Sequence, residues 1–525
     1  METLLLSGNE AIALGAYEAG VKVGVGYPGT PSTEILENLK EHKDVYTEWS
    51  VNEKVALEVG IGASLGGART LVTMKHVGVN VAADPLFTVS YMGVKGGLVI
   101  ISADDPFMHS SQNEQDNRNY AYAAKIPMLE PSDSEEARSF TKLAFELSEK
   151  YDTPVFLRPT TRVCHAYSIV NVDKNKDKRV EIDKGRFERN LKKYVMIPAY
   201  ARARHFIVED RENLIKEDAN TLSINKTEYN NTDVGYITSG ISYHYVKEAA
   251  PDASILKLGM VYPLPEKLIK EFCSKVKKVV IVEELEPFFE TRIKAMGISV
   301  TGKNVFPITG ELSPDSISNF LGKQKETPLT INSKVPPRPP ALCKGCPHSF
   351  VYETLGKMNI TVAGDIGCYT LGVLPPYNGI DTCVDMGGSI TVAQGLELTD
   401  PSKTYAAIIG DSTFAHSGIT GLVNAAYNGR KNLIIILDNG TTAMTGMQPN
   451  PFSGETIQSL PAEPVNYYHL CKAVGISDEN FIEVNAYKPA EIESAIKKLL
   501  ATKKLSVLLV KGLCIIYNKK KSKKQ

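Results

Sequence analysis

Two polar residues that follow apolar segments in the C-terminal third of the sequence could hold a divalent cation. Asp411 follows YAAIIG, and Asn439 follows NLIIILD, 28 positions further on. One strand–helix–strand crossover has this length, so both residues are expected at the carboxyl ends of neighbouring parallel strands, where open α/β sheets bind ligands. A carboxylate and an amide oxygen suit Mg2+, which prefers oxygen ligands and substrate phosphates. The alternative is an ordinary Rossmann-like crossover with an aspartate at a turn.

Four cysteines of the same region could bind a metal. Cys343 and Cys346 form a CxxC pair, which is compatible with zinc, a redox pair or an iron–sulfur cluster. Cys368 and Cys514 lie at expected element ends, although free cysteines are often merely small buried hydrophobic residues. Cys383 is the main rival for a ligand position. The other cysteines are expected in the core: Cys164, Cys273 and Cys471.

Further polar residues in the N-terminal region could serve a reaction. Thr30 and Ser32, in YPGTPSTE, are placed to cap a following helix whose N-terminus would favour an anion. Glu53 opens the helical segment VNEKVALEVG, with Glu48 and Glu58 as nearby competitors, but a glutamate at a helix start is more often a dipole or capping residue. His109 could transfer protons near neutral pH, or could be an ordinary loop residue.

The elements around these residues predict an α/β protein with three doubly wound α/β domains. Short apolar runs such as TLVTMK, GGLVIISADD and TPVFLRPT are typical of buried parallel strands. The first and third domains look like two copies of one architecture. The expected divisions are residues 1–167, a linker with connecting segments at 168–231, residues 232–335, residues 336–518 with the cysteines, and a basic tail at 519–525.

Composition limits the classes of protein that this chain can represent. A chain of 525 residues is too long to fold around one hydrophobic core, so more than one domain is expected. The net charge of −1, with 23% charged residues, favours neither nucleic acid nor a membrane surface as a partner. We expect no signal peptide and no membrane span. Eight cysteines in so long a chain indicate reduced thiols, so the sequence predicts a soluble cytoplasmic protein.

Six motifs together resemble one known family. They are YPGTPSTE, VNEKVALEVGIGAS, ADDPFMHSSQNEQDNR, LCKGCPH, GDIGCYTLG and DNGTTAMTG. The chain resembles the alpha-subunit family of indolepyruvate:ferredoxin oxidoreductases, thiamine diphosphate-dependent enzymes of anaerobes, from Met1 to about Tyr517. The resemblance implies two domains of thiamine diphosphate-binding fold, one for the pyrimidine and one for the diphosphate, with a transketolase C-terminal-like domain between them.

The resemblance also implies a set of cofactor-binding residues. Mg2+ would be held by Asp411, Asn439 and the backbone carbonyl of Thr441. Glu53 would hydrogen-bond the aminopyrimidine ring and help to activate the cofactor, and Thr30 would contact the substrate. The cofactor-binding set as a whole is Gly410, Asp411, Ser412, Asn439, Thr441, Met386, Gly387 and Gly388, with Ser412 in place of the usual glycine.

For the cysteines, the resemblance implies that Cys343, Cys346, Cys368 and Cys514 ligate one 4Fe–4S cluster. The implied reaction is oxidative decarboxylation of an aryl 2-oxoacid such as indolepyruvate to acyl-CoA and CO2, with electrons passed through the cluster to ferredoxin. The implied partner is a small beta (gamma-type) subunit, which makes a hetero-oligomer. A non-oxidative 2-oxoacid decarboxylase and a non-catalytic assembly or electron-relay subunit are the alternatives.

Two features depart from the family pattern. Some pyruvate enzymes bind the substrate carboxylate with an arginine after the third strand, where this chain has Asp104 and Asp105. A small 2-oxoacid held in that way is therefore not expected. The C-terminal ferredoxin-like module common in the subfamily is also not expected, because the sequence ends at KKKSKKQ. Electrons would then leave through another subunit or a free ferredoxin.

Overall fold

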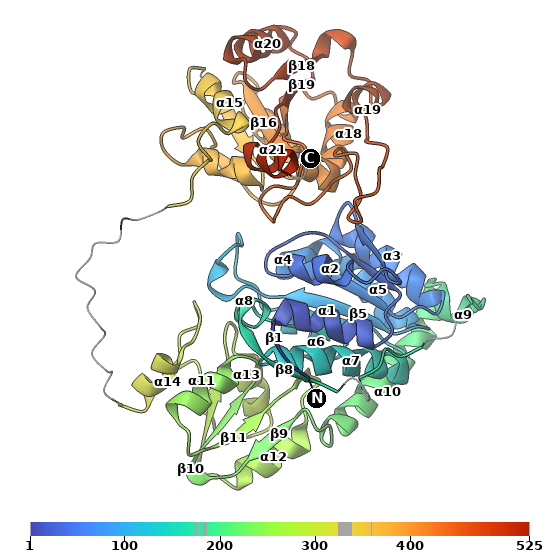
Figure 1. The fold of residues 1–525 in the computed structure, drawn as a ribbon, viewed down its shortest axis with the longest axis vertical. Helices are drawn as coiled ribbons and strands as arrows, with labels where there is room; N and C mark the ends of the chain where they lie inside the picture. Colours follow the sequence, from blue (N-terminus) through green and yellow to red (C-terminus); the bar gives the residue numbers. More distant parts are fainter. Residues whose placement is uncertain are drawn as a thin grey trace. The chain divides into compact units, whose positions relative to one another are not determined.

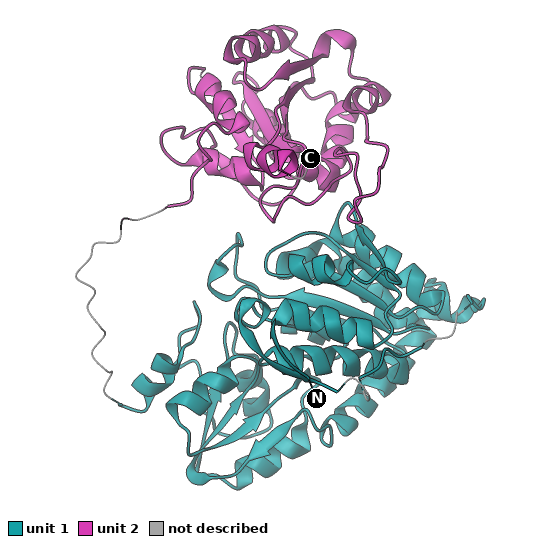
Figure 2. Ribbon diagram, viewed as in Figure 1, with its two compact units in different colours: residues 1–330 teal, residues 331–525 magenta. Residues whose placement is uncertain are grey.

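The computed structural model describes residues 2–173, 177–181, 186–323, 336, 339–358 and 360–523 of the chain. They form two compact units, 1–330 and 331–525, shown in separate colours in Figure 2. Parts of the expected linker at 168–231, the end of the division expected at 232–335 and the end of the basic tail fall outside the described residues. The expected divisions of the chain stay predictions.

A seven-stranded sheet forms the centre of unit 1 (Figure 1). Its order is β12 (Met260–Tyr262), β6 (Met128–Leu129), β7 (Val155–Leu157), β5 (Leu98–Ala103), β4 (Thr70–Lys75), β2 (Val23–Gly26) and β3 (Tyr46–Trp49). All neighbours are parallel except β12 and β6. Every residue of β5 is buried, as expected for a parallel strand with both sheet faces covered. Helix α3 (Glu53–Leu65) packs on β2 and β4, and α7 (Ser134–Tyr151) packs on β5 and β7.

The order of the strands fixes where a ligand can bind. The chain leaves β2 toward β3 and leaves β4 toward β5, in opposite directions along the sheet. The carboxyl ends of β2 and β4 therefore border a topological switch point, where doubly wound sheets form their binding crevice. The segment that contains Thr30 follows β2, and Lys75 ends β4.

Unit 1 contains a second, four-stranded sheet. Its order is β13 (Lys278–Val282), β10 (Asn231–Thr238), β11 (Ala253–Lys257) and β9 (Lys226–Glu228). Helix α11 (Ser242–Ala249) packs on one face through Val246, and α12 (Glu266–Ser274) packs on the other through Phe272. Strand β12, from this part of the chain, completes the larger sheet, and one apolar core runs from Met128 to Phe288 and Phe289. The two sheets therefore belong to a single unit.

The N-terminal segment of unit 1 forms a short strand before its first helix. Strand β1 (Glu2–Ser7) pairs antiparallel with β8 (Tyr167–Val172). Helix α1 (Gly8–Glu18) begins with a capping box, in which Ser7 and Glu10 exchange hydrogen bonds. Helix α10 (Pro198–Ala219) lies in the segment expected to connect domains and packs on α5 (Ala83–Met92).

A six-stranded parallel sheet forms unit 2. Its order is β15 (Thr382–Cys383), β14 (Thr361–Gly364), β16 (Tyr405–Gly410), β17 (Leu433–Asp438), β19 (Ser506–Lys511) and β18 (Phe481–Asn485). Alternate residues of β16 enter two separate cores, because successive side chains of a strand point to opposite faces. Helices α15 (Pro347–Leu355) and α20 (Pro489–Ala501) cover one face, and α16 (Ser389–Thr399) and α18 (Ile419–Tyr427) cover the other.

The switch point of this sheet lies between β14 and β16. The chain leaves β14 toward β15 and β16 toward β17. Asp365 follows β14 and Asp411 follows β16, so a Gly-Asp pair stands at the end of each of these two neighbouring strands. The predicted α/β class with doubly wound parallel sheets is confirmed. Within the part of the chain that the structure describes, no helix is both long and apolar enough to span a bilayer.

Candidate functional site

Glu53 is a buried carboxyl group at the carboxyl edge of the unit 1 sheet. It is the first residue of α3, and 4% of its surface is exposed. A Cβ atom at Gly78 would lie 2.7 Å from Glu53 Oε1, so α4 (His76–Val81) approaches Glu53 closely only because residue 78 is a glycine.

The two competing glutamates are occupied elsewhere. Glu58 is exposed and forms an ion pair with Lys54 on the same helix. Glu48 accepts hydrogen bonds from the hydroxyls of Tyr46 at 2.7 Å and Ser50 at 2.8 Å. Because Glu48 and Glu58 already have these partners, Glu53 is the better candidate for the predicted catalytic carboxyl group.

Thr30 lies in the loop after β2. Its carbonyl accepts a hydrogen bond from the Ser110 hydroxyl at 3.3 Å. The expected side-chain cap on helix α2 (Thr33–Leu39) is wrong, because Ser32 stands at the N-cap position but donates its hydroxyl to the carbonyl of Gly29 at 2.9 Å. The tight turn of this loop uses the hydroxyl that would otherwise cap the helix.

Asp105 holds a second loop, after β5, against this one. It accepts hydrogen bonds from the Ser110 amide at 2.9 Å, the Ser111 hydroxyl at 2.6 Å and the Thr161 hydroxyl at 2.7 Å. Burial opposes ionisation of Asp105, but these hydrogen bonds and nearby Lys75 outweigh burial and lower its pKa.

Asp104 is directed into the protein interior. Its Oδ2 atom lies 2.7 Å from Arg158 Nε and accepts the Asn117 amide at 3.1 Å. Complete burial raises its pKa despite the adjacent Arg158 cation. The two aspartates that replace the arginine of some pyruvate enzymes thus bind parts of this chain.

Lys75 ends β4 between these loops. Its Nζ atom donates a hydrogen bond to the carbonyl of Ser110 at 2.8 Å. Its side chain runs along the loop after β2, since a Cβ at Gly29 would lie 3.1 Å from Lys75 Cδ. Burial lowers the pKa of Lys75 to about 8, although Asp105 and Glu53 oppose that shift.

His109 lies in the loop after β5 and is held by another segment of unit 1. Its Nε2 atom is 3.0 Å from Glu311 Oε2, and its ring packs edge to face on Phe107. Glu311 also pairs with Arg162. A proton-transfer role for His109 stays a prediction, and it would have to compete with the contact between His109 and Glu311.

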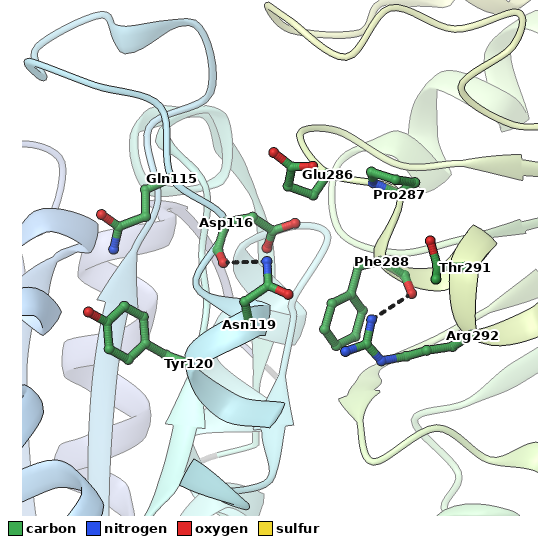
Figure 3. A pocket seen from close by; sticks show the side chains of 9 residues that line it. All are labelled: Gln115, Asp116, Asn119, Tyr120, Glu286, Pro287, Phe288, Thr291 and Arg292. Atoms are coloured by element: carbon green, nitrogen blue, oxygen red, sulfur yellow. Dashed lines mark hydrogen bonds between the residues drawn. The ribbon is translucent and has the colours of Figure 1, made fainter. Parts of the chain in front are cut away.

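A pocket of about 490 Å3 lies between α6 (Arg118–Ala124) and α13 (Phe288–Ala295). Figure 3 shows Tyr120 on one side and Phe288 and Arg292 on the other, with Asp116 between them. Asp116 is ion-paired with Arg118 at 2.6 Å. None of the predicted site residues lines this pocket.

In unit 2, Asp411 and Asn439 lie at the ends of neighbouring strands. Gly410 of β16 pairs with Leu437 of β17, which places Asp411 beside Asp438. Burial raises the pKa of Asp411, and the charge of Asp438 raises it further. The Oδ2 atom of Asp411 is buried and has no hydrogen-bond partner within 3.5 Å among the described residues, although the nearby Asn450 side chain lowers the pKa of Asp411 against these effects. A buried carboxylate oxygen in this situation is expected to be stabilised by a cation.

The segment after β17 supplies further oxygen atoms. Asn439 Oδ1 accepts the Thr441 amide at 3.1 Å. The hydroxyl of Thr442 donates to that of Ser412 at 3.0 Å, which ties this segment to the turn after β16. Gly440, between Asn439 and Thr441, has φ +74°, a conformation that a side chain would strain.

The DMGGS turn, residues 385–389, is hydrogen-bonded to Asp365. The Asp365 carboxylate accepts the amides of Gly387 and Ser389 at 2.8 and 2.9 Å. Gly387 has φ +90°, and a Cβ there would lie 2.4 Å from Ser417. Met386 is partly exposed in this turn, and Gly388 precedes α16. Burial raises the pKa of Asp365 to about 6, against these amide hydrogen bonds.

The four predicted cluster cysteines influence one another. Burial raises the pKa of Cys368 to about 12, and the neighbouring Cys346, Cys514 and Cys343 add to that shift. The pKa of Cys346 rises for the same reasons, with Cys343 and Cys514 as neighbours. The pKa of Cys383 is raised by burial and by two aspartates, with no cysteine among its causes. All eight cysteines of the chain are free thiols.

The cysteine region is joined to the Asn439 segment by two contacts. The amide of Cys514 donates to the carbonyl of Asn439 at 3.0 Å. His348 Nε2 lies 3.5 Å from Asn439 Nδ2. Burial lowers the pKa of His348 to about 4, so its ring is neutral and can accept a hydrogen bond.

Comparisons with known proteins agree with both units. Residues 14–222 match the family described as pyruvate flavodoxin/ferredoxin oxidoreductase, thiamine diP-bdg, and residues 365–510 match thiamine pyrophosphate enzyme, C-terminal TPP binding domain. Indolepyruvate oxidoreductase subunit IorA of Archaeoglobus fulgidus is 41% identical over 98% of this chain and 87% of that protein. The same subunit of Methanothermobacter marburgensis is 38% identical over the same shares.

The chain belongs to the IorA family. It is therefore a thiamine diphosphate-dependent subunit of an oxidoreductase, and neither a non-oxidative decarboxylase nor a non-catalytic subunit is favoured. A solved 2-oxoglutarate:ferredoxin oxidoreductase from Magnetococcus marinus shares the fold, with a TM-score of 0.52 and 18% identity. The alignment covers 61% of this chain and 65% of that one.

Some polar residues at these two edges were not predicted as site residues of this IorA-family chain. Asp365 was missed although it repeats the Gly-Asp pattern of Gly410 and Asp411 at the end of a short apolar run, a signal visible in the sequence. Lys75 was missed because a lysine that ends a strand is normally exposed.

Among the described residues, no three histidine, cysteine, aspartate or glutamate side chains are arranged to hold one metal ion. The predicted Mg2+ ligands include only one such side chain, that of Asp411. A four-iron cluster separates its thiolates more widely than a single ion does, because iron and sulfide lie between them. Neither predicted site needs three ionisable side chains around one atom.

Proposed function

We propose that this chain is the thiamine diphosphate-binding subunit of an enzyme that oxidatively decarboxylates an aryl 2-oxoacid, such as indolepyruvate. The acyl product would pass to coenzyme A, and the electrons would pass through a 4Fe–4S cluster to ferredoxin. The partner would be a small beta (gamma-type) subunit. The substrate class follows the names of its relatives, whereas the residues below follow from the chain itself.

Asp411, Asn439 and the Thr441 carbonyl would hold Mg2+. Support comes from the buried Oδ2 atom of Asp411, which has no hydrogen-bond partner among the described residues, and from its raised pKa. Both observations indicate a carboxylate that lacks a positive neighbour. One carboxylate with neutral oxygens leaves room for the phosphate oxygens and waters that Mg2+ prefers.

The remaining cofactor contacts would come from backbone and from Glu53. Gly387 and Gly388 allow close backbone approach, with Asp365 holding the turn, and Met386 would contact the cofactor from the same turn. Gly410 and Ser412 flank Asp411 in the diphosphate motif. When bound, thiamine diphosphate supplies the electron sink for decarboxylation.

Glu53 would hold and return a proton at the pyrimidine ring. Its burial suits this task, because a carboxylate away from water binds a ring nitrogen without competition. Thr30 would contact the substrate from the loop after β2. His109 would serve as a proton donor near that loop.

The four cysteines carry the oxidative part of the proposal. Cys343, Cys346, Cys368 and Cys514 would provide the four thiolates that such a cluster requires. Their mutual effect on thiol pKa indicates one shared region, and Cys514 is hydrogen-bonded to Asn439. The joining of a cysteine group to the diphosphate segment is the observation that favours oxidation over simple decarboxylation.

The test is to measure iron and acid-labile sulfide in anaerobically purified protein, with a visible spectrum. We expect about four irons per chain. We also expect bleaching on addition of indolepyruvate and coenzyme A once the partner subunit is present. Absence of iron, with aldehyde and CO2 released by thiamine diphosphate alone, would establish a decarboxylase instead.

A further inference from the structure

Lys75 is a partly buried cation at the switch point of the unit 1 sheet. It stands at the end of β4, beside β2, whose following loop contains Thr30. The side chain lies against Gly29, next to Thr30, and its charge acts on Glu53 and Asp105. Lys75 is therefore placed between the residue predicted to contact the substrate and the residue predicted to contact the cofactor.

The ammonium group of Lys75 has unused hydrogen-bonding capacity. An ammonium has three N–H donors, and one of them reaches the Ser110 carbonyl at 2.8 Å. In the described part of the chain, Asp105 and Glu53 act on Lys75 through their charges and without a side-chain hydrogen bond to it. The charges of Asp105 and Glu53 do not outweigh the loss of hydration on burial, and an anionic ligand would add a counter-charge in direct contact with the ammonium group.

The nearby carboxylates do not serve as a counter-charge in direct contact with Lys75. Asp105 already accepts hydrogen bonds from Ser110, Ser111 and Thr161. Glu53 acts on Lys75 through its charge. His76, the next residue, has its pKa lowered by burial and is neutral at physiological pH, so it adds no second positive charge.

We propose that Lys75 binds the carboxylate group of the 2-oxoacid substrate. It would supply the positive charge that other enzymes obtain from an arginine after the next strand, where Asp104 and Asp105 stand here. Because Lys75 stands at the end of β4 and not after β5, the substrate carboxylate would bind near Gly29, Thr30 and Glu53. This inference rests on the proposed function, since it names the substrate group that the same site recognises.

The test compares the wild type with Lys75→Met, Lys75→Arg and Lys54→Met. Lys54 is the matched control, an exposed lysine beside Glu53 that pairs with Glu58. The binding probes are 3-phenylpropionate and its neutral amide, titrated calorimetrically into the full chain with thiamine diphosphate and Mg2+. Values of KM and kcat for an aryl 2-oxoacid are measured on the assembled enzyme.

We expect Lys75→Met to weaken binding of 3-phenylpropionate and raise KM by about 10- to 100-fold, the range for a hydrogen bond to a charged group. Binding of the amide should stay unchanged, and kcat should change far less than KM. Lys75→Arg should retain most of the affinity, and Lys54→Met all of it.

Equal carboxylate binding by wild type and Lys75→Met would overturn the inference. So would an equal loss of carboxylate and amide binding, because a collapsed loop predicts that result. Failure of the wild type to bind the probe would also overturn it. Lys75-dependent binding of the probe without oxidation of any 2-oxoacid would contradict the proposed function alone and keep the carboxylate site.

Discussion

Asp411 and Asp438 follow paired positions of two neighbouring strands, and both carboxyl groups are shielded from water. Burial raises the pKa of each, and the charge of Asp438 raises that of Asp411 further. The raised pKa values show that ionising both carboxyl groups together is unfavourable, and Asp411 Oδ2 has no hydrogen-bond partner in the described part of the chain. A divalent cation at this edge would stabilise both groups as carboxylates.

We predict that Asp411→Asn abolishes Mg2+-dependent binding of thiamine diphosphate and raises the melting temperature of the ligand-free protein. The second effect follows because the wild-type carboxyl group, with its raised pKa, must take up a proton or bury a charge on folding, and an amide does neither. Mg2+ with thiamine diphosphate at about 100 times its Kd should stabilise the wild type by about 2.7 kcal/mol and the variant by none of this. Calorimetric titration and thermal unfolding measure both. Asp478→Asn, at an exposed position of unit 2, should behave as wild type.

The cluster prediction can be tested at single cysteines. Cys514→Ser should lower the iron and sulfide content of anaerobically purified protein well below four irons per chain, because a four-iron cluster needs four thiolates. Cys383→Ser is the matched control, since no cysteine influences the thiol pKa of Cys383. If Cys383→Ser loses iron while Cys514→Ser keeps it, the fourth ligand has been assigned to the wrong residue.

The placement of Asp411 and Asn439 at neighbouring strand ends could be predicted from sequence, because both residues follow apolar runs joined by one crossover. The pairing of β16 with β17 confirms that placement, and the cation site itself stays a prediction. Glu53 could not be separated from Glu48 and Glu58 by sequence, since only folding buries the first and exposes or pairs the others. Burial is a property of tertiary packing.

The contacts between loops could not be predicted from the sequence. Ser110 lies 80 positions from Thr30, yet its hydroxyl donates to the Thr30 carbonyl and its own carbonyl accepts from Lys75. No periodicity marks such a contact. The failed Ser32 cap has a similar origin, because a tight turn at Gly29 competes for the hydroxyl that a helix start would use.

Glu53 should be required for turnover but not for folding. Glu53→Gln keeps the size and hydrogen-bonding shape of the side chain and removes its ability to accept a proton as a base. Activity should fall by about 10²- to 10⁴-fold, the usual contribution of a general acid–base group. Glu58→Gln removes an exposed carboxylate of the same helix and should retain full activity. Equal activity of the two variants would exclude Glu53 as the proton-transferring residue.

Glu284 gives unit 1 a stability that depends on pH. Burial raises its pKa to about 7, against the hydrogen bond from the Leu312 amide at 3.0 Å. The folded state therefore holds a proton that the unfolded chain releases near pH 4.5. Because the native state binds more protons between these values, its free energy of unfolding falls as the pH rises from about 4.5 to 7. Each pKa unit corresponds to 1.36 kcal/mol, so the rise from 4.5 to about 7 corresponds to a loss of about 3 kcal/mol in the free energy of unfolding.

Glu284→Gln should remove this dependence, because glutamine accepts the Leu312 amide without ionising. At pH 8 the variant should be more stable than wild type by up to about 3 kcal/mol, and near pH 4 the two should converge. Denaturant unfolding followed by the fluorescence of Trp49, the single tryptophan, reports on unit 1. Parallel curves of stability against pH for the two proteins would mean that Glu284 ionises at its ordinary pKa, so that another charged group of the buried cluster carries the proton.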